Sequence, residues 1–247
     1  RSMTDKDAGV DKENFHLTLL ARDKEGYRNL MKLVTKAHLE GFYYRPRIDK
    51  EHLAKFSGGL IALSGCNSSE ISKSFIEGDH KKAQKLAGEY QQIFGKENFY
   101  IEVQRHLFDK FQTAHEPGSE IHADLQRMAG DEKKIIEGAK ALAKSAKIPL
   151  VATNDLHYVL AADAQAQDII VCIQTGKTIA ETKRLRMIDS PTFYLKSTEE
   201  MSELFADIPE AITNTSKIAE KVNIEIELSK VAFPHFEVPK DTTADVY

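Results

Sequence analysis

Apolar and polar residues along this chain follow two periods in alternation, one typical of strands and one typical of helices. Short apolar runs bounded by turn residues predict four strands, at residues 16–21, 59–66, 99–104 and 150–155. Apolar positions at helical spacing predict helices between them, at residues 23–41, 49–56, 69–77, 79–94 and 133–145. This order predicts an α/β fold with a mainly parallel sheet and helices outside it, as an open sheet or a barrel.

Two regions depart from this alternation. Residues 106–131 show weak periodicity and contain turn residues, so we expect an inserted surface loop with one helical turn. After a helix that Gly176 should end, a short strand leads to Ser197 and Glu200, which have the spacing of a capping box. We therefore expect a first domain and a helical region that follows it, at residues 1–185 and 186–247.

Composition narrows the class of protein. The 247 residues are 41% hydrophobic and 29% charged, as in a soluble globular protein that can bury a sizeable core. No apolar run reaches the roughly 20 residues that span a bilayer, and residues 1–14 lack the apolar core of a signal peptide, so we expect a cytoplasmic protein. The net charge of −4 gives no general attraction for nucleic acid, so a DNA contact would need local basic clusters.

Candidate metal ligands occur near the ends of the predicted strands. The fourth strand ends in Asp155 and His157, which alternation along a strand would place on the same side. The second strand ends at Cys66, whereas His16 opens its strand and fits a shared site poorly. Imidazole, thiolate and carboxylate groups suit zinc and other transition metals. From the residues alone, loop-capping polar groups and ordinary core residues remain alternatives.

The segment "GFYYRPRID" is a candidate DNA contact. Arg45 and Arg47 could bind phosphate, and Tyr43 or Tyr44 could stack on an unpaired base. Alternatively, the tyrosines pack the loop and the arginines pair with nearby acids. Glu102, on the third strand, could hold an arginine or serve in catalysis.

Six segments together resemble a known family. In chain order they are "HLTLLARDKEGYRNLMKLVTKAHLEGFYYRPRID", "GLIALSGC", "NFYIEVQRH", "IPLVATNDLHYV", "DAQAQDIIVCIQTGKT" and "FYLKSTEEMSELFAD". They resemble the amino-terminal part of bacterial DNA polymerase III alpha subunits, namely the polymerase-and-histidinol-phosphatase (PHP) domain and the start of the region that leads to the polymerase core. The likeness covers nearly the whole chain.

The resemblance implies a fold and a site. The fold would be a distorted β/α barrel of PHP type, incomplete at its amino-terminal end, with a C-terminal helical appendage. The family's metal-ligand positions fall on His16, Cys66, Asp155 and His157, with Asp155 and His157 also catalytic. Zinc or manganese there would support 3′–5′ exonuclease chemistry, the hydrolysis of a phosphodiester. The alternatives are an inactive scaffold that braces the polymerase and a free-standing phosphatase.

The resemblance also implies what lies outside this chain. The family's H-x-H motif and further ligands would precede residue 1, and the magnesium-binding carboxylates of the polymerase core would follow residue 247. The chain is therefore expected to be an internal fragment that is a poor nuclease alone. Its implied partners are a single-stranded DNA 3′ end, the rest of the alpha chain and replisome subunits such as the sliding clamp.

Overall fold

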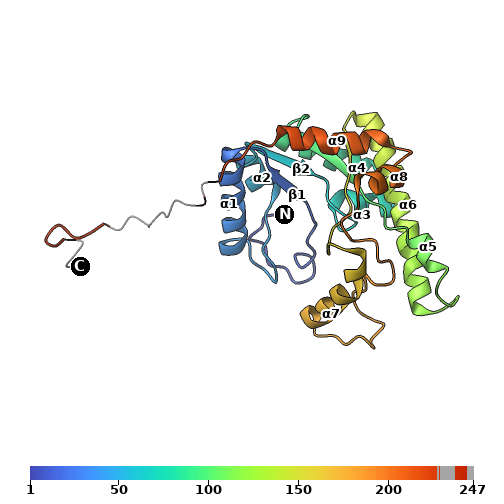
Figure 1. Ribbon diagram of the computed structural model, residues 1–247. Coiled ribbons are helices and arrows are strands. Elements are labelled where there is room, and N and C mark those ends of the chain that lie inside the picture. The colour runs from blue at the N-terminus through green and yellow to red at the C-terminus, as the bar shows by residue number, and fades with distance from the viewer. Residues whose placement is uncertain (227, 229–236, 244–247) are drawn as a thin grey trace.

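Four strands form one sheet in the order β1-β2-β3-β4, with helices packed around it (Figure 1). The computed structural model describes residues 1–226, 228 and 237–243. The strands are β1 Thr18–Ala21, β2 Leu60–Leu63, β3 Phe99–Val103 and β4 Leu150–Ala152. The first six helices are α1 Lys24–Leu39, α2 Lys50–Lys55, α3 Glu70–Ile76, α4 His80–Phe94, α5 Phe108–Gln112 and α6 Glu120–Ala146. Then follow a 3-10 helix, η1 Ala161–Asp163, and the helices α7 Ala164–Thr175, α8 Thr198–Leu204 and α9 Pro209–Lys221.

The predicted α/β fold is confirmed, with one correction to the sheet. β2, β3 and β4 pair in parallel, but β1 pairs with β2 antiparallel, with Thr18 opposite Leu63 and Ala21 opposite Leu60. The start of β1 therefore lies beside the end of β2. Within the described residues the sheet is open, and the barrel remains a prediction.

A close approach of two glycines explains the direction of β1. After β1 the chain enters α1, and α2 returns it to Gly59, which accepts a hydrogen bond from Arg22 N at 2.8 Å. Gly59 has φ +71°, and a Cβ on Gly26 would lie 1.9 Å from the Gly59 carbonyl oxygen. Only residues without side chains allow this contact. The contact fixes the start of β2 at the end of β1.

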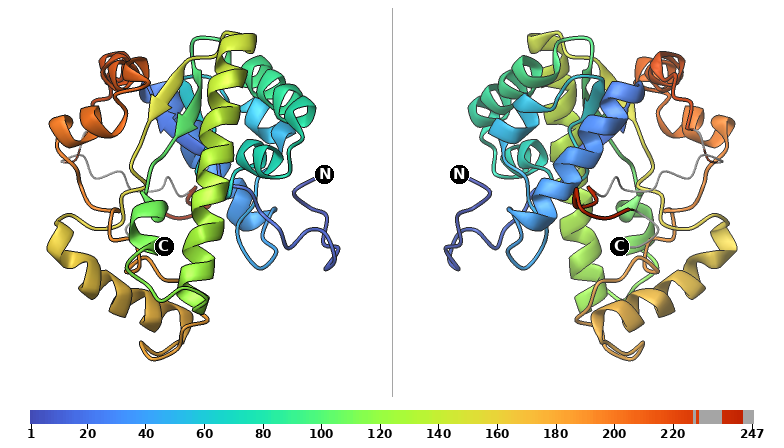
Figure 2. Two further views of the ribbon diagram at one scale, coloured as in Figure 1. Left: turned by 90° about the vertical axis from the view of Figure 1, so that its right-hand side faces the viewer. Right: turned by 90° about the vertical axis from the view of Figure 1, so that its left-hand side faces the viewer.

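Both faces of the sheet are covered, as Figure 2 shows for the helices on either side. Side chains of β2 alternate between them. Leu60 and Ala62 join the main core with α1, α2, α3, α4 and α6, whereas Ile61 and Leu63 pack on the opposite face with Ile218 of α9. The second face is less completely filled and holds the pocket described below.

The expected loop over residues 106–131 is wrong from Glu120 onward, where a helix of 27 residues begins. Ser119 caps it by accepting a hydrogen bond from His122 N. Ile121, Leu125 and Met128 lie at helical spacing and join a second small core around Phe108, Tyr158 and Phe193. The polar residues between them hid this period in the sequence.

The C-terminal helices pack against the sheet. The predicted capping box is present, since Ser197 and Glu200 each accept a hydrogen bond from the other's backbone. The predicted strand from Phe193 is reduced to one bridge between Tyr194 and Tyr158. Asn214 of α9 donates to Leu150 O at 2.7 Å, so α9 covers β4. The boundary at residues 185/186 and the helical appendage remain predictions. Among the described residues, none of the helices combines the length and the apolar character needed to cross a membrane.

Candidate functional site

A pocket of about 760 Å³ opens on the α9 face of the sheet. Leu63, Val151 and Ile218 form part of its apolar wall, and Thr215 of α9 adds a hydroxyl. Its polar lining includes His16, Cys66, Glu102, Gln104, Asn154 and Asp155. Three of the four predicted metal ligands therefore lie around one cavity, although long stretches of sequence separate them.

His16 and Cys66 are in direct contact. His16 Nδ1 lies 3.3 Å from Cys66 Sγ, and His16 N donates to Ser68 O at 3.2 Å. Gly65, with φ +91°, makes this possible, because a Cβ there would lie 2.5 Å from the His16 carbonyl oxygen. The expectation that His16 would fit poorly is wrong. Because β1 is antiparallel, its start meets the end of β2.

The surroundings of Cys66 favour the thiol over the thiolate. Burial raises its pKa, and the negative charges of Asp155 and Glu102 raise it further. A metal ligand must be the thiolate, so a cation at this position would have to displace the proton. Cys66 and Asp155 both line this cavity.

Glu102 organises the floor of the pocket. Its side chain is buried, and one oxygen accepts from Thr18 Oγ1 at 3.3 Å and from Gly65 N at 3.0 Å. The other oxygen accepts from Thr153 Oγ1 at 2.5 Å and from Gln104 Nε2 at 3.2 Å. No arginine pairs with Glu102 in the part of the chain that the structure describes. The carboxylate instead ties β1, β3 and the end of β4 together.

Asp155 and His157 do not project side by side as predicted. β4 ends at Ala152, and Asp155 has φ +46°, so strand alternation does not reach these residues. Asp155 lines the pocket, whereas His157 is exposed and outside the lining. His157 Nδ1 lies 2.6 Å from the Asp155 carbonyl oxygen, so Nδ1 is the donor and only Nε2 is available for another contact.

The loop after β4 is fastened by a polar network that the sequence did not reveal. Asn154 donates to Thr192 O at 3.0 Å and to Tyr194 O at 2.6 Å. Lys196 Nζ donates to Asn154 Oδ1 at 2.9 Å and also contacts Thr192 O. Burial lowers the pKa of Lys196. The run of Thr153 and Asn154 directly after a buried strand was the available signal.

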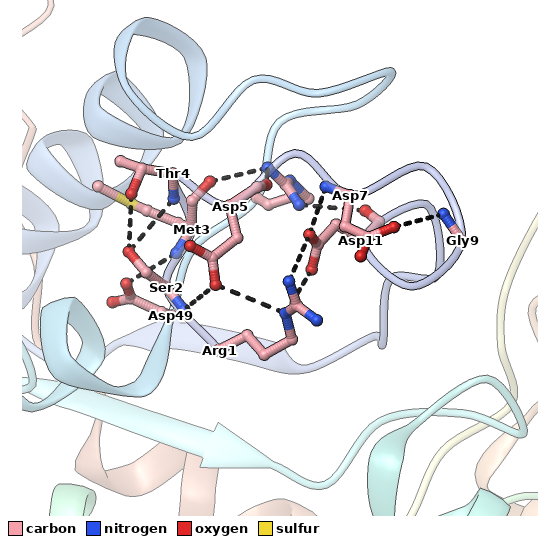
Figure 3. Close-up of polar contacts among 10 residues, drawn as sticks. Arg1, Ser2, Met3, Thr4, Asp5, Asp7, Gly9, Asp11 and Asp49 are labelled. Atoms are coloured by element: carbon pink, nitrogen blue, oxygen red, sulfur yellow. Dashed lines mark hydrogen bonds and ion pairs between the residues drawn. The ribbon is translucent and has the colours of Figure 1, made fainter.

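Arg47 is held by contacts within the chain, and its predicted DNA contact stays a prediction. Its guanidinium donates to the backbone carbonyls of Gly41, Met3, Asp5 and Asp11, at 2.8 to 3.1 Å. Figure 3 shows the segment that it fastens, where Arg1 pairs with Asp11 and Met3 N donates to Asp49. Four of the five N–H groups of Arg47 are therefore occupied, and the side chain acts as a structural anchor.

The other predicted DNA contacts remain predictions. Tyr44 is 64% exposed and Arg45 is also exposed, whereas Tyr43 is half-buried with its ring 5.2 Å from the Arg47 guanidinium. Lys12 Nζ lies 4.8 Å from the centre of the Tyr44 ring. The adjoining residues 1–13 carry four acidic and three basic side chains, so this segment adds no net attraction for phosphate.

Comparison with known proteins supports the resemblance that the sequence indicates. Residues 4–106, which include His16 and Cys66, match the PHP domain family. Over these residues the chain is similar to a PHP domain. Over 232 residues it is 37% identical to the DNA polymerase III subunit alpha of Treponema pallidum, covering 94% of this chain and 18% of that protein.

Other relatives extend this finding. Identity is 39% over 235 residues to the DNA polymerase III subunit alpha of Borreliella burgdorferi, covering 95% of this chain and 18% of that protein. It is 38% over 227 residues to that of Helicobacter pylori, covering 88% and 17%. The resemblance inferred from the sequence is confirmed. The chain spans less than a fifth of the length of these relatives.

Proposed function

We propose that this chain is the PHP part of a replicative DNA polymerase alpha subunit, and that its pocket supplies ligands to a metal-dependent 3′–5′ exonuclease site. The observation that supports the proposal is the meeting of His16, Cys66 and Asp155 around one cavity in a chain that matches the PHP family. These residues offer nitrogen, sulfur and oxygen ligands, a set suited to zinc, and the carboxylate also suits manganese.

The described residues do not fit a complete metal site. Among them, no group of three or more His, Cys, Asp and Glu side chains is arranged to hold an ion. Both carboxylate oxygens of Glu102 accept hydrogen bonds from other residues of the chain. His157 lies outside the pocket lining. We therefore assign His16, Cys66 and Asp155 the role of ligand donors and derive no hydrolytic step from them. His157 is a ligand in this proposal only if its loop turns toward the pocket.

The proposal places polymerase chemistry, with its magnesium, in parts of the polypeptide outside this chain. The substrate of the PHP site would be the 3′ end of single-stranded DNA. Its partners would be the remaining alpha chain and replisome subunits such as the sliding clamp, in the cytoplasm. The relatives support this through their name, DNA polymerase III subunit alpha.

A digestion assay tests the exonuclease. The polypeptide of the relatives' length that contains this chain is incubated with 5′-labelled single-stranded DNA and manganese or zinc. We expect His16→Ala and Asp155→Asn to lower 3′–5′ digestion by about 100-fold, as loss of a metal ligand does, while polymerase activity persists. Glu137→Gln, at an exposed position of α6, is the matched control. Undiminished digestion by both site variants would overturn the proposal.

A scaffold without catalysis is the second candidate. It is favoured by the absence of a three-ligand group among the described residues. In that case neither metal would promote digestion by the unaltered polypeptide. Pocket variants would then lower only the thermal stability of the polymerase.

A further inference from the structure

Helix α7 carries an exposed apolar surface away from the pocket. Ile169, Ile170 and Ile173 lie at helical spacing on one side of it and are 42%, 56% and 77% exposed. Val159 and Leu160 precede η1 and are 61% and 62% exposed. Helix α7 contacts η1. We call these five residues the α7 apolar face. Figures 1 and 2 show that α7 projects from the body of the molecule.

The stretch of sequence that forms this surface carries few charged side chains. Residues 158–175 contain no lysine, arginine or glutamate, although 29% of the whole chain is charged. Both aspartates in this stretch have structural partners. Asp163 accepts from Leu160 N at 3.0 Å, and Asp168 is buried in a bidentate pair with Arg184 at 2.7 Å. Large apolar patches of this kind mark interaction sites in soluble proteins.

A single exposed leucine elsewhere shows the contrast. Leu39, at the end of α1, is 79% exposed, as much as Ile173. Its neighbours in sequence include Lys36, His38 and Glu40, so it is one apolar residue within a charged surface. Isolated residues of that kind are common and have no special meaning.

We infer that the α7 apolar face packs against another part of the alpha-subunit polypeptide. The occupant must be apolar, because the face offers no cation to a nucleic acid and no charge to an ionic partner. The relatives supply such a partner in the same polypeptide, since the chain covers only 17% to 18% of the first three. When both surfaces belong to one polypeptide, their contact is intramolecular and has no separate cost of association. A small apolar face can therefore be enough to hold them together. This inference rests on the proposed function, in that it takes the chain to be part of an alpha subunit.

Hydrogen exchange on the longer polypeptide tests the inference. Ile173→Lys is compared with Leu39→Lys, which makes the same chemical change at an equally exposed and equally helical position. Because Ile173 is 77% exposed within this chain, lysine there removes no packing inside the PHP domain. We expect Ile173→Lys to raise amide exchange in residues 164–175 by about tenfold and to lower the midpoint of thermal unfolding. Leu39→Lys should change neither.

Other outcomes separate this inference from competing explanations. Unchanged exchange in Ile173→Lys would overturn it. A concentration-dependent dimer that dissociates in Ile173→Lys would also overturn it, because the occupant would be a second copy. The result is independent of the exonuclease: Ile173→Lys changes no predicted ligand, and loss of digestion in the pocket variants says nothing about α7. A polypeptide without nuclease activity but with protected α7 amides would retain the interface and reject the metal site.

Discussion

Replacing Glu132 with glutamine should change how stability depends on pH. Glu132 is on α6, and its Oε1 accepts a hydrogen bond from His106 N at 2.6 Å. Burial raises the pKa of Glu132 from 4.5 to about 7, although the hydrogen bond from His106 opposes this change. The folded protein therefore holds a proton on Glu132 over a pH range in which the unfolded chain has released it.

The direction and size of this pH effect on the unfolding free energy follow from the linkage between proton binding and folding. The stability that Glu132 contributes is complete below pH 4.5 and is lost as pH rises through about 7. A difference of about 2.5 between the two pKa values corresponds to at most about 3 kcal/mol. Because water still reaches part of the side chain, we expect about 1–3 kcal/mol.

His106 has the opposite effect. Burial, with smaller contributions from Lys196 and His157, lowers its pKa from 6.5 to about 3. Its contribution is complete above pH 6.5 and is lost as pH falls toward 3. Between pH 4.5 and 6.5 the two residues therefore largely cancel in the unaltered protein. In Glu132→Gln only the His106 effect remains, so stability should rise with pH across this window.

Urea unfolding at a series of pH values measures the effect. The quantity of interest is the difference in unfolding free energy between Glu132→Gln and the unaltered protein. Glutamine keeps a carbonyl oxygen for His106 N, so the pH-independent loss should be small. We expect the variant to gain about 1–3 kcal/mol relative to the parent between pH 4.5 and 7. Glu137→Gln, on the exposed side of the same helix, should follow the parent. A constant difference for Glu132→Gln would refute the reasoning.

Three further changes test the fold around the pocket. In Glu102→Gln the new amide NH₂ group would point at Gly65 N or Gln104 Nε2, both of which are donors, so one hydrogen bond is lost. The free energy of unfolding should fall by about 1–3 kcal/mol, measured by chemical unfolding. An unchanged midpoint would contradict the hydrogen-bond network. Gly59→Ala should lower the free energy of unfolding more than Gly78→Ala, because a Cβ on residue 59 would lie 2.3 Å from Asp23 Oδ1. Gly78 has a similar φ but open space around it, so Gly78→Ala should cost only about 1–2 kcal/mol in the same measurement. Arg47→Lys should speed proteolysis of residues 1–14 by about tenfold without changing low-salt binding of single-stranded DNA; weaker binding would restore its predicted role.

The sequence was most informative where local chemistry decides structure. Ser197 was recognised as part of a capping box and Gly176 as a helix end, because capping depends on a few adjacent residues. The four strands were located for the same reason, since each is a short apolar run.

Features that depend on distant contacts could not be derived in this way. The direction of β1 is set by the contact of Gly26 with Gly59, and only that direction brings His16 to Cys66. Three of the four hydrogen bonds of Glu102 likewise come from segments distant in the sequence, through Thr18, Gly65 and Thr153. The family resemblance selected the ligand positions, and the antiparallel strand explains how His16 and Cys66 meet.

The hydrogen bonds of Arg47 show a structural role that its motif did not indicate. An aromatic and basic loop is typical of a nucleic-acid contact, but the carbonyls of residues 3, 5, 11 and 41 take up this guanidinium. Nothing in the loop sequence indicates that the segment at residues 1–11 folds over it. Such a contact becomes visible only in three dimensions.

Cobalt titration of the longer polypeptide tests the central claim most directly, because a thiolate bound to Co²⁺ gives a charge-transfer absorption that does not depend on activity. We predict that this band appears in the parent and in Cys172→Ser, which alters a cysteine buried in α7, and that it is lost in Cys66→Ser. His16→Ala and Asp155→Asn should each weaken cobalt affinity by about 10- to 100-fold. A band that survives Cys66→Ser, or no band in the parent, would contradict the assignment of this pocket as part of a metal site.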